Sequence, residues 1–208
     1  FRQSGWFAVD AQAEQAVLAH TARQRHLSAP AAPLQNADDV LALAEQWLQQ
    51  SCPPWLMGWR DICRATDERT VIASVVPLAG TDFTLRVSIA EMPAKDAALL
   101  IANLNALVLD FVCRQKVGGT HLADYISKQL PVLPPDRYTE ADLAYIVPRV
   151  LELTYTAHDL AGWARDLGHN GPPFPFAPER RAQLRAELDA YYARLYGLTR
   201  DELRYILD

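Results

Sequence analysis

The sequence has few of the residues that mark a disulfide scaffold or a metal centre. Its 208 residues include only three cysteines, Cys52, Cys63 and Cys113, and no CxxC pair. An odd, sparse set suits a reducing compartment, so we expect a cytoplasmic protein. His20 and His26 lie six residues apart, which places them on different faces of a helix, and neither has a nearby cysteine or carboxylate pair. We therefore expect no metal site.

Long apolar runs are also missing. The most apolar stretch, residues 97–112, is interrupted by Asn103, Asn105 and Asp110, which makes it too short and too polar to span a bilayer. We expect a buried helix there and no membrane partner. The N-terminal residues lack the basic and then apolar form of a signal peptide. Because the chain begins with Phe1 and not Met, we expect it to be a piece of a longer protein.

Basic charge is not in excess. The formal net charge is −5, and residues 60–130 contain eight Lys or Arg and eight Asp or Glu. Domains that bind nucleic acid are usually basic, so the composition argues mildly against that role. A local strip of cations within the neutral central part remains open.

Hydrophobic patterns predict an α+β fold, with a small sheet-containing core and a buried long helix. An N-terminal helical segment and a C-terminal helical region flank this core, and the expected parts are residues 1–54, 55–135 and 136–208. In the first part, Trp6, Phe7 and Val9 predict the end of a strand. An Ala/Gln-rich helix and a linker, SAPAAP, follow, and Asn36 predicts the start of another helix.

Two strands are expected at residues 71–77 and 83–89. In the second, Phe83, Leu85, Val87 and Ile89 alternate with polar residues, which predicts one buried face. The turn LAGTD between the two stretches predicts a hairpin or neighbouring strands.

Helices account for much of the remainder. Residues 94–114 predict one long helix with a buried stripe of Leu100, Leu104, Leu107 and Phe111. Residues 139–208 are expected to be almost wholly helical. Their start and stop signals are Pro178, Gly197 and a capping box of Thr199 and Glu202.

The stretch RQKVGGT, residues 114–120, combines two cations with a Gly-Gly-Thr turn. Glycine lets backbone amides approach an anion closely, so the turn suits a phosphate. Gly118 is equally compatible with ending the preceding helix in the left-handed conformation. A helix C-terminus repels anions, so Arg114 and Lys116 would have to offset its dipole.

Three stretches in order, residues 55–77, 100–135 and 181–208, resemble the C-terminal part of large bacterial restriction–modification methylases of the Eco57I-like kind. These are adenine-N6 DNA methyltransferases, and the resemblance covers residues 55–208. It implies a DNA target recognition domain whose partners are double-stranded DNA and the missing methyltransferase portion of the same polypeptide. The Gly-Gly-Thr turn and LPVLPP also resemble the specificity subunits of multi-chain restriction systems.

The methylase chemistry itself is not expected in this fragment. Its motif for the flipped adenine needs a side-chain acceptor before Pro-Pro, and NGPPFPF at residues 170–176 has Gly171 there. We expect this loop to pack Phe174 and Phe176 on the helices. No Gly-rich loop follows a strand, so S-adenosylmethionine is expected to bind only in the parent protein. A nuclease site built from Asp82, Glu91 and Lys95 has the wrong spacing.

Two polar stretches are the candidates for DNA contact, because the planar fork of arginine can hold phosphate or guanine with two hydrogen bonds. The predicted DNA-binding residues are Arg60, Arg64, Thr66, Arg69, Thr70, Arg114, Lys116, Gly118, Gly119, Thr120 and Lys128. The cations among them should gather on one side of the domain. The alternative is pairing of Arg60 or Arg64 with Asp61, Asp67 or Glu68, which would only fix the loop.

A second function stays open beside DNA recognition. The acidic helical C-terminus suits a protein-interaction or scaffolding domain that docks on the methylase or nuclease part without touching DNA.

Overall fold

The computed structural model describes residues 41–43, 46, 54–88 and 92–207, which fall into two compact units, Phe1–Cys52 and Pro53–Asp208. In the first unit, residues 41–43 are helical, as expected. The start of that helix at Asn36 and the strand end at Trp6 lie outside the described residues.

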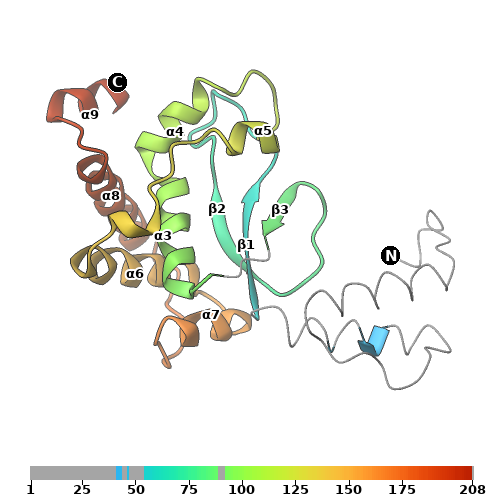
Figure 1. Ribbon diagram of the computed structural model, residues 1–208. Helices are drawn as coiled ribbons and strands as arrows, with labels where there is room; N and C mark the ends of the chain where they lie inside the picture. The colour runs from blue at the N-terminus through green and yellow to red at the C-terminus, as the bar shows by residue number, and fades with distance from the viewer. Residues whose placement is uncertain (1–40, 44–45, 47–53, 89–91, 208) are drawn as a thin grey trace, which may run out of the picture. The chain divides into compact units, whose positions relative to one another are not determined.

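The second unit is an α+β structure around a three-stranded antiparallel sheet (Figure 1), so the predicted fold class is confirmed. Its strands are β1 (Trp55–Arg60), β2 (Ala73–Pro77) and β3 (Leu85–Ser88), in the order β2-β1-β3. The expected pairing of β2 with β3 is therefore wrong, because each of them pairs with β1. The first four residues of β1 are all buried, so this central strand lacks the alternation that marks a half-buried strand.

Strand β3 lies at an edge of the sheet, and its predicted buried face is wrong too. Phe83, just before the strand, is 76% exposed, and Val87 is 36% exposed. Alternation in the sequence identified the strand, but the face it marked points largely to solvent.

The expected helix 94–114 is two helices, α3 (Ala94–Asn105) and α4 (Leu107–Arg114), bent by 55° at extended Ala106. Side-chain contacts between elements hold the break. The Asn105 amide bonds both the N–H and the carbonyl of Ala73 in β2, and the Asp189 carboxylate accepts from the N–H of Leu107 at 2.7 Å. The predicted stripe of buried residues is only partly buried in this bent pair: Leu104, Leu107 and Phe111 are half-buried.

The C-terminal part is helical as predicted, with no strand among residues 139–207. Thr199 and Glu202 form the expected capping box, and Gly197 ends its helix at φ 76°. The remaining helices are α5 (Asp124–Ser127), η2 (Pro135–Arg137), α6 (Glu140–Thr154), η3 (His158–Leu160), α7 (Ala161–Asp166), α8 (Pro178–Leu195) and α9 (Arg200–Leu207).

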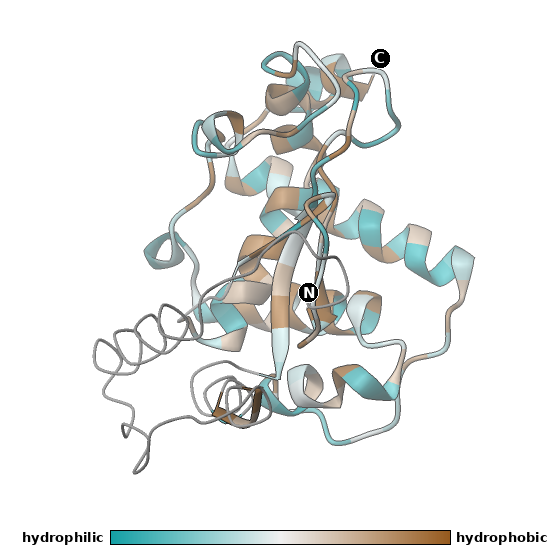
Figure 2. Ribbon diagram, turned by 90° about the vertical axis from the view of Figure 1, so that its right-hand side faces the viewer, coloured by the Kyte–Doolittle hydropathy of each residue, from teal (hydrophilic) through white to brown (hydrophobic). Residues whose placement is uncertain are grey.

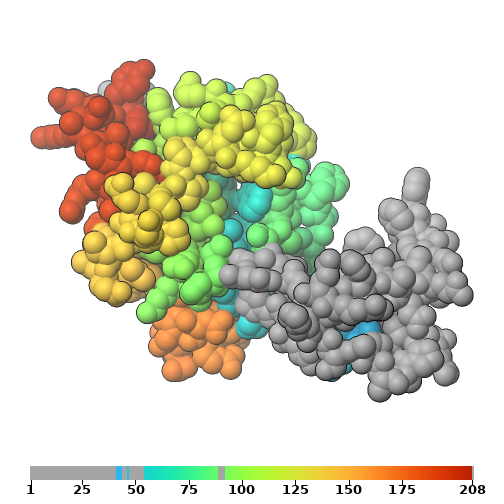
Figure 3. Space-filling model, in the orientation of Figure 1, coloured from blue at the N-terminus to red at the C-terminus, as the bar shows by residue number. Residues whose placement is uncertain are grey.

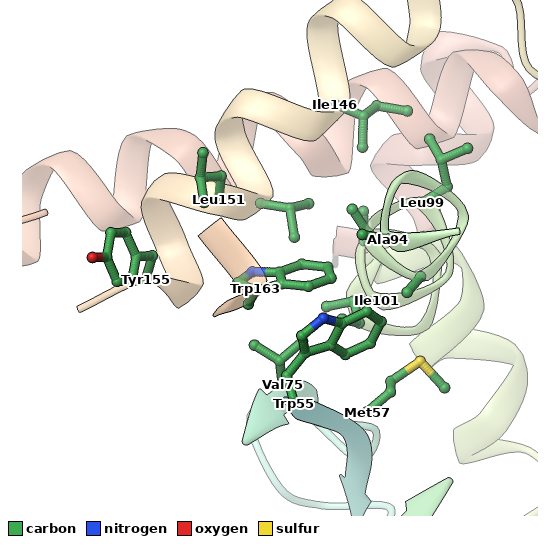
Figure 4. Packing of buried hydrophobic residues seen from close by; sticks show 14 of the residues in the cluster. Trp55, Met57, Val75, Ala94, Leu99, Ile101, Ile146, Leu151, Tyr155 and Trp163 are labelled. Carbon is green, nitrogen blue, oxygen red and sulfur yellow. The ribbon is translucent and has the colours of Figure 1, made fainter. Parts of the chain in front are cut away.

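The main core forms where the sheet meets α3, α6, α7 and α8, and Figure 2 shows hydrophobic residues concentrated there. Trp55 of β1 and Trp163 of α7 meet edge to face with ring centroids 4.7 Å apart (Figure 4). The predicted parts 55–135 and 136–208 share this one core.

A second, smaller core lies under the loops at one end of the sheet. Its buried residues are Cys63, Val71, Leu109, Cys113, Val117, Leu122, Ile126 and Leu130. These residues come from the segment after β1, from α4 and from the chain around α5. The predicted DNA-binding stretches pack on this second core.

No single helix in the described part of the chain is long and apolar enough to cross a membrane. Helices α3 and α4 reach such a length and apolar composition only together, as a pair bent by 55°.

The sheet predicts a steric effect at Gly58, in the middle of β1. A Cβ there would lie 2.9 Å from the carbonyl oxygen of Arg86 in β3, and a backbone atom cannot move aside cheaply. We expect Gly58→Ala to lower the free energy of unfolding by about 1–3 kcal/mol in urea denaturation. Gly80→Ala is the control: a Cβ at Gly80 meets nothing within 4 Å, so it should change stability by less than about 0.5 kcal/mol. Equal effects would contradict the close approach of β3.

Candidate nucleic-acid interface

The two stretches predicted to contact DNA lie side by side at one end of the unit. Ile62 and His121 form an antiparallel bridge, the N–H of Cys63 donates to the Thr120 carbonyl at 3.0 Å, and the N–H of Leu122 donates to the Asp61 carbonyl at 2.7 Å. The loop 61–70 is thereby joined to the Gly-Gly-Thr turn. In Figure 3, α4, the turn and α5 (light green to yellow-green) form the surface at this end.

A buried aspartate anchors the loop. The Asp110 side chain in α4 is fully buried, and one of its oxygens accepts from the backbone N–H groups of Thr70 and Val71, each at 2.8 Å. Its other oxygen accepts from Nε of Arg114 at 2.8 Å. Because burying a carboxylate is costly without such partners, this arrangement fixes the end of the loop against α4.

Arg114 holds the middle of the same loop, whereas Asp110 holds its end. Its guanidinium donates to three backbone carbonyls, those of Ala65 (3.2 Å), Asp67 (2.7 Å) and Glu68 (2.6 Å). With Asp110 this makes a clamp, so Arg114 supports the loop and does not extend to solvent as a DNA contact.

Arg60 and Arg69 also pair inside the protein. Arg60 meets Asp67 at 3.1 Å, which is the internal pairing that the sequence left open. Arg69 meets Asp189 of α8 at 2.6 Å, and Thr70 is fully buried. The expected face of six gathered cations is therefore not present, because three of the six take up internal ion pairs.

Three cations remain at the surface: Arg64, Lys116 and Lys128. Within the described residues, the side chains of Arg64 and Lys128 form no hydrogen bond or ion pair, and Lys116 meets only the neutral amide of Gln129, at 3.5 Å. Thr66 and Thr120, in the same two stretches, are also exposed. We call the surface made by Arg64, Thr66, Lys116, the turn 118–120 and Lys128 the cationic face.

Neither a positive φ nor close packing against the described residues requires glycine at positions 118 and 119. Helix α4 ends at Arg114, and Gly118 and Gly119 are not among the described glycines with positive φ, so Gly118 does not end the helix in the left-handed conformation. A Cβ at either position would meet nothing within 4 Å. The open space around their backbone therefore lies on the outside of the molecule.

Sequence reasoning missed a hydrogen-bonded network beside the turn. Buried Asp61 accepts from Nε of Arg86 and pairs with Nδ1 of His121, each at 2.5 Å, and Arg86 also pairs with Asp124 at 2.7 Å. Burial by itself would raise the pKa of Asp61, but these hydrogen bonds outweigh it and hold the pKa below its ordinary value. No local signal could have found the network, because the residues that bond to each other in it are 25 to 60 positions apart in the sequence.

The described residues contain neither a cluster suited to a metal ion nor a cysteine with a lowered pKa. None of their His, Cys, Asp and Glu side chains gather in groups of three or more that could hold a metal ion. Burial raises the pKa of the Cys113 thiol to about 12 and also raises that of Cys63, so neither suits a thiolate nucleophile. In the NGPPFPF loop, Phe174 packs on Tyr155 and His169 as expected, whereas Phe176 is 68% exposed.

Compared with models of known protein families, with curated proteins and with solved structures, the chain matches none.

The clamp predicts that Arg114 and Lys116 differ sharply although they are two residues apart. Arg114→Ala leaves the buried Asp110 carboxylate without its cation and releases three loop carbonyls, so we expect a loss of about 3 kcal/mol in the free energy of unfolding. Lys116→Ala should cost less than about 0.5 kcal/mol. Urea denaturation of both variants measures this, and a stable Arg114→Ala protein would rule out the clamp.

The Asp61 network predicts a pH dependence of stability. Because the folded pKa lies below the ordinary value of 3.8, the stabilisation is complete above that pH and is lost as pH falls through the folded pKa. We expect Asp61→Asn to destabilise the protein by about 2 kcal/mol at pH 7, and the difference from the unsubstituted protein to shrink below about pH 4. Denaturation at several pH values tests this; a difference that does not vary with pH would contradict it.

Proposed function

We propose that Pro53–Asp208 binds duplex DNA through the cationic face, as the target recognition part of a restriction–modification adenine-N6 methyltransferase whose catalytic portion lies outside this chain. The observation that supports DNA binding is the joining of loop 61–70, which carries Arg64, to the Gly-Gly-Thr turn through Ile62 and Cys63, together with two further exposed cations, Lys116 and Lys128, without acidic partners among the described residues. The methylase parentage rests on the resemblance of residues 55–77, 100–135 and 181–208. The proposal carries with it a cytoplasmic location.

The acids near the cationic face do not cancel its charge. Asp67 is paired with Arg60, and Asp61 and Asp124 are paired with Arg86. Arg60 neutralises Asp67, and Arg86 neutralises one of its two carboxylates. The other carboxylate and the exposed Glu68 are set against Arg64, Lys116 and Lys128, so the formal charge of these nine residues is +1. In this way a chain of net charge −5 presents a local positive surface.

The face is also held in place before any ligand arrives. The Asp110–Arg114 clamp fixes loop 61–70, and the bridge at Ile62 fixes the turn. A preorganised loop loses less conformational freedom on binding, which favours affinity. The unobstructed backbone at Gly118 and Gly119 lets amide groups approach a phosphate closely.

One observation favours the second candidate, a protein-docking domain. Ile62 (47%), Phe83 (76%) and Tyr125 (68%) are exposed large hydrophobic residues on segments that adjoin the cationic face. Exposed apolar residues next to charge are typical of protein interfaces as well. The two candidates differ in their dependence on salt.

Binding of the whole chain to duplex DNA, measured by fluorescence anisotropy over a series of salt concentrations, tests the proposal. We expect the change of Arg64, Lys116 and Lys128 together to Ala to weaken binding and to flatten the slope of log affinity against log salt by up to about 2.7, since each phosphate contact contributes about 0.9. If Arg64 reads a guanine, Arg64→Ala alone should also relax base preference, at about 1–3 kcal/mol.

Lys95→Ala is the matched control, because Lys95 is an exposed lysine in the first turn of α3, away from the cationic face. It should leave the slope unchanged. No binding to DNA at low salt, or an equal effect of the control, would refute the proposal and favour the docking domain.

A further inference from the structure

A pocket on the other side of loop 61–70 is lined by a concentration of arginine that DNA binding does not explain. It has a volume of about 270 Å³ and lies between β2, the end of α3, α6 and α8. Its walls are apolar, with Ile101, Val150, Leu153 and Leu188 among them. The volume is just below the range of about 300–1,000 Å³ usual for small-molecule sites.

Three arginines line this pocket: Arg69, Arg181 and Arg185. The one carboxylate in the lining, Asp189, already accepts from Arg69 Nη2 at 2.6 Å and from the Leu107 N–H at 2.7 Å. Three arginines and one aspartate give the lining a formal charge of +2. Burial and the charge of Arg185 lower the pKa of Arg181, so the two cations oppose each other where they stand.

The hydrogen-bonding groups of the pocket residues that lack a partner are donors. Arg185 forms no hydrogen bond or ion pair with the described residues, and the buried Arg69 Nη1 has no hydrogen-bond partner among them. Arg181 donates from Nη1 to the Leu153 carbonyl at 2.8 Å and stacks over the Phe176 ring, so only its remaining N–H groups are available to a ligand. By contrast, the Asn105 amide is fully occupied by Ala73 and Ile101, and the Thr154 hydroxyl by Trp163 and Val150. The site therefore complements a ligand that accepts hydrogen bonds and carries negative charge.

We propose that this pocket binds a small organic anion, with a carboxylate or phosphate head on Arg69, Arg181 and Arg185 and an apolar body against Ile101, Val150 and Leu188. Guanidinium groups suit both heads, because their paired N–H groups match two oxygens. The apolar walls favour an organic body over a bare ion. The pocket and the cationic face have different linings, so this inference stands apart from DNA binding.

Titration calorimetry of the whole chain tests the pocket with four probes: benzoate, phenyl phosphate, inorganic phosphate and neutral benzamide. We expect benzoate or phenyl phosphate to bind with a dissociation constant of about 1 mM or lower. Inorganic phosphate should bind at least about tenfold more weakly because it lacks the apolar body, and benzamide should not bind because it lacks the charge. Equal binding of benzamide and benzoate, or no binding of either organic anion, overturns the proposal.

Arg185→Gln identifies the site. Arg185 is exposed, so the change should preserve the fold, which circular dichroism checks, and it should weaken binding of the organic anion by about tenfold or more. Arg185→Lys should recover part of that loss. The control is Arg165→Gln, at another exposed arginine outside the pocket, and it should change affinity less than about twofold. Unchanged affinity in Arg185→Gln would place any bound anion elsewhere and refute the assignment.

Discussion

The buried carboxylate of Asp110 is the constraint on which the rest of this end of the molecule depends. It reaches from α4 to the backbone N–H groups of Thr70 and Val71, and it fixes Arg114, which in turn holds three carbonyls of loop 61–70. A loop of that length with free backbone groups would lose much entropy on ordering. The hydrogen bonds of the clamp offset this loss of entropy. They hold the loop in the conformation in which Ile62 bridges to His121 and Arg64 is exposed.

The parts of the fold that local patterns define were predictable. The helices of residues 139–207 follow from their own stop and start signals, such as Gly197 and the Thr199–Glu202 capping box. Central strand β1 gave no such signal, because burial on both faces removes alternation. The break at Ala106 depends on Asn105 reaching β2 and on Asp189 reaching Leu107, and neither contact has a signature within the helix sequence.

The candidate site divides in the same way. The sequence identified both stretches that meet in the structure, because glycine, arginine and threonine in polar turns are visible locally. It could not sort the arginines. Arg60 pairs with Asp67 seven residues away, but Arg69 pairs with Asp189 at a separation of 120 residues. An arginine with no acidic residue near it in the sequence can still form an ion pair with a distant residue in the fold. Long-range contacts therefore decide which arginines remain available to a ligand.

Loop 60–70 joins the two surfaces, and this affects how substitutions in it can be interpreted. The carbonyl of Arg69 accepts from Arg60 near the cationic face, while its side chain pairs with Asp189 in the arginine pocket. The next residue, Thr70, is held by Asp110. A loss of DNA affinity on changing Arg69 would therefore not identify a DNA contact. The same change disturbs the loop, the pocket and Asp189, which also accepts from the N–H of Leu107 at the start of α4. The side chains of Arg64, Lys116 and Lys128 are exposed and form no ion pair with the described residues. Substituting them therefore tests DNA binding by the cationic face without disturbing the fold.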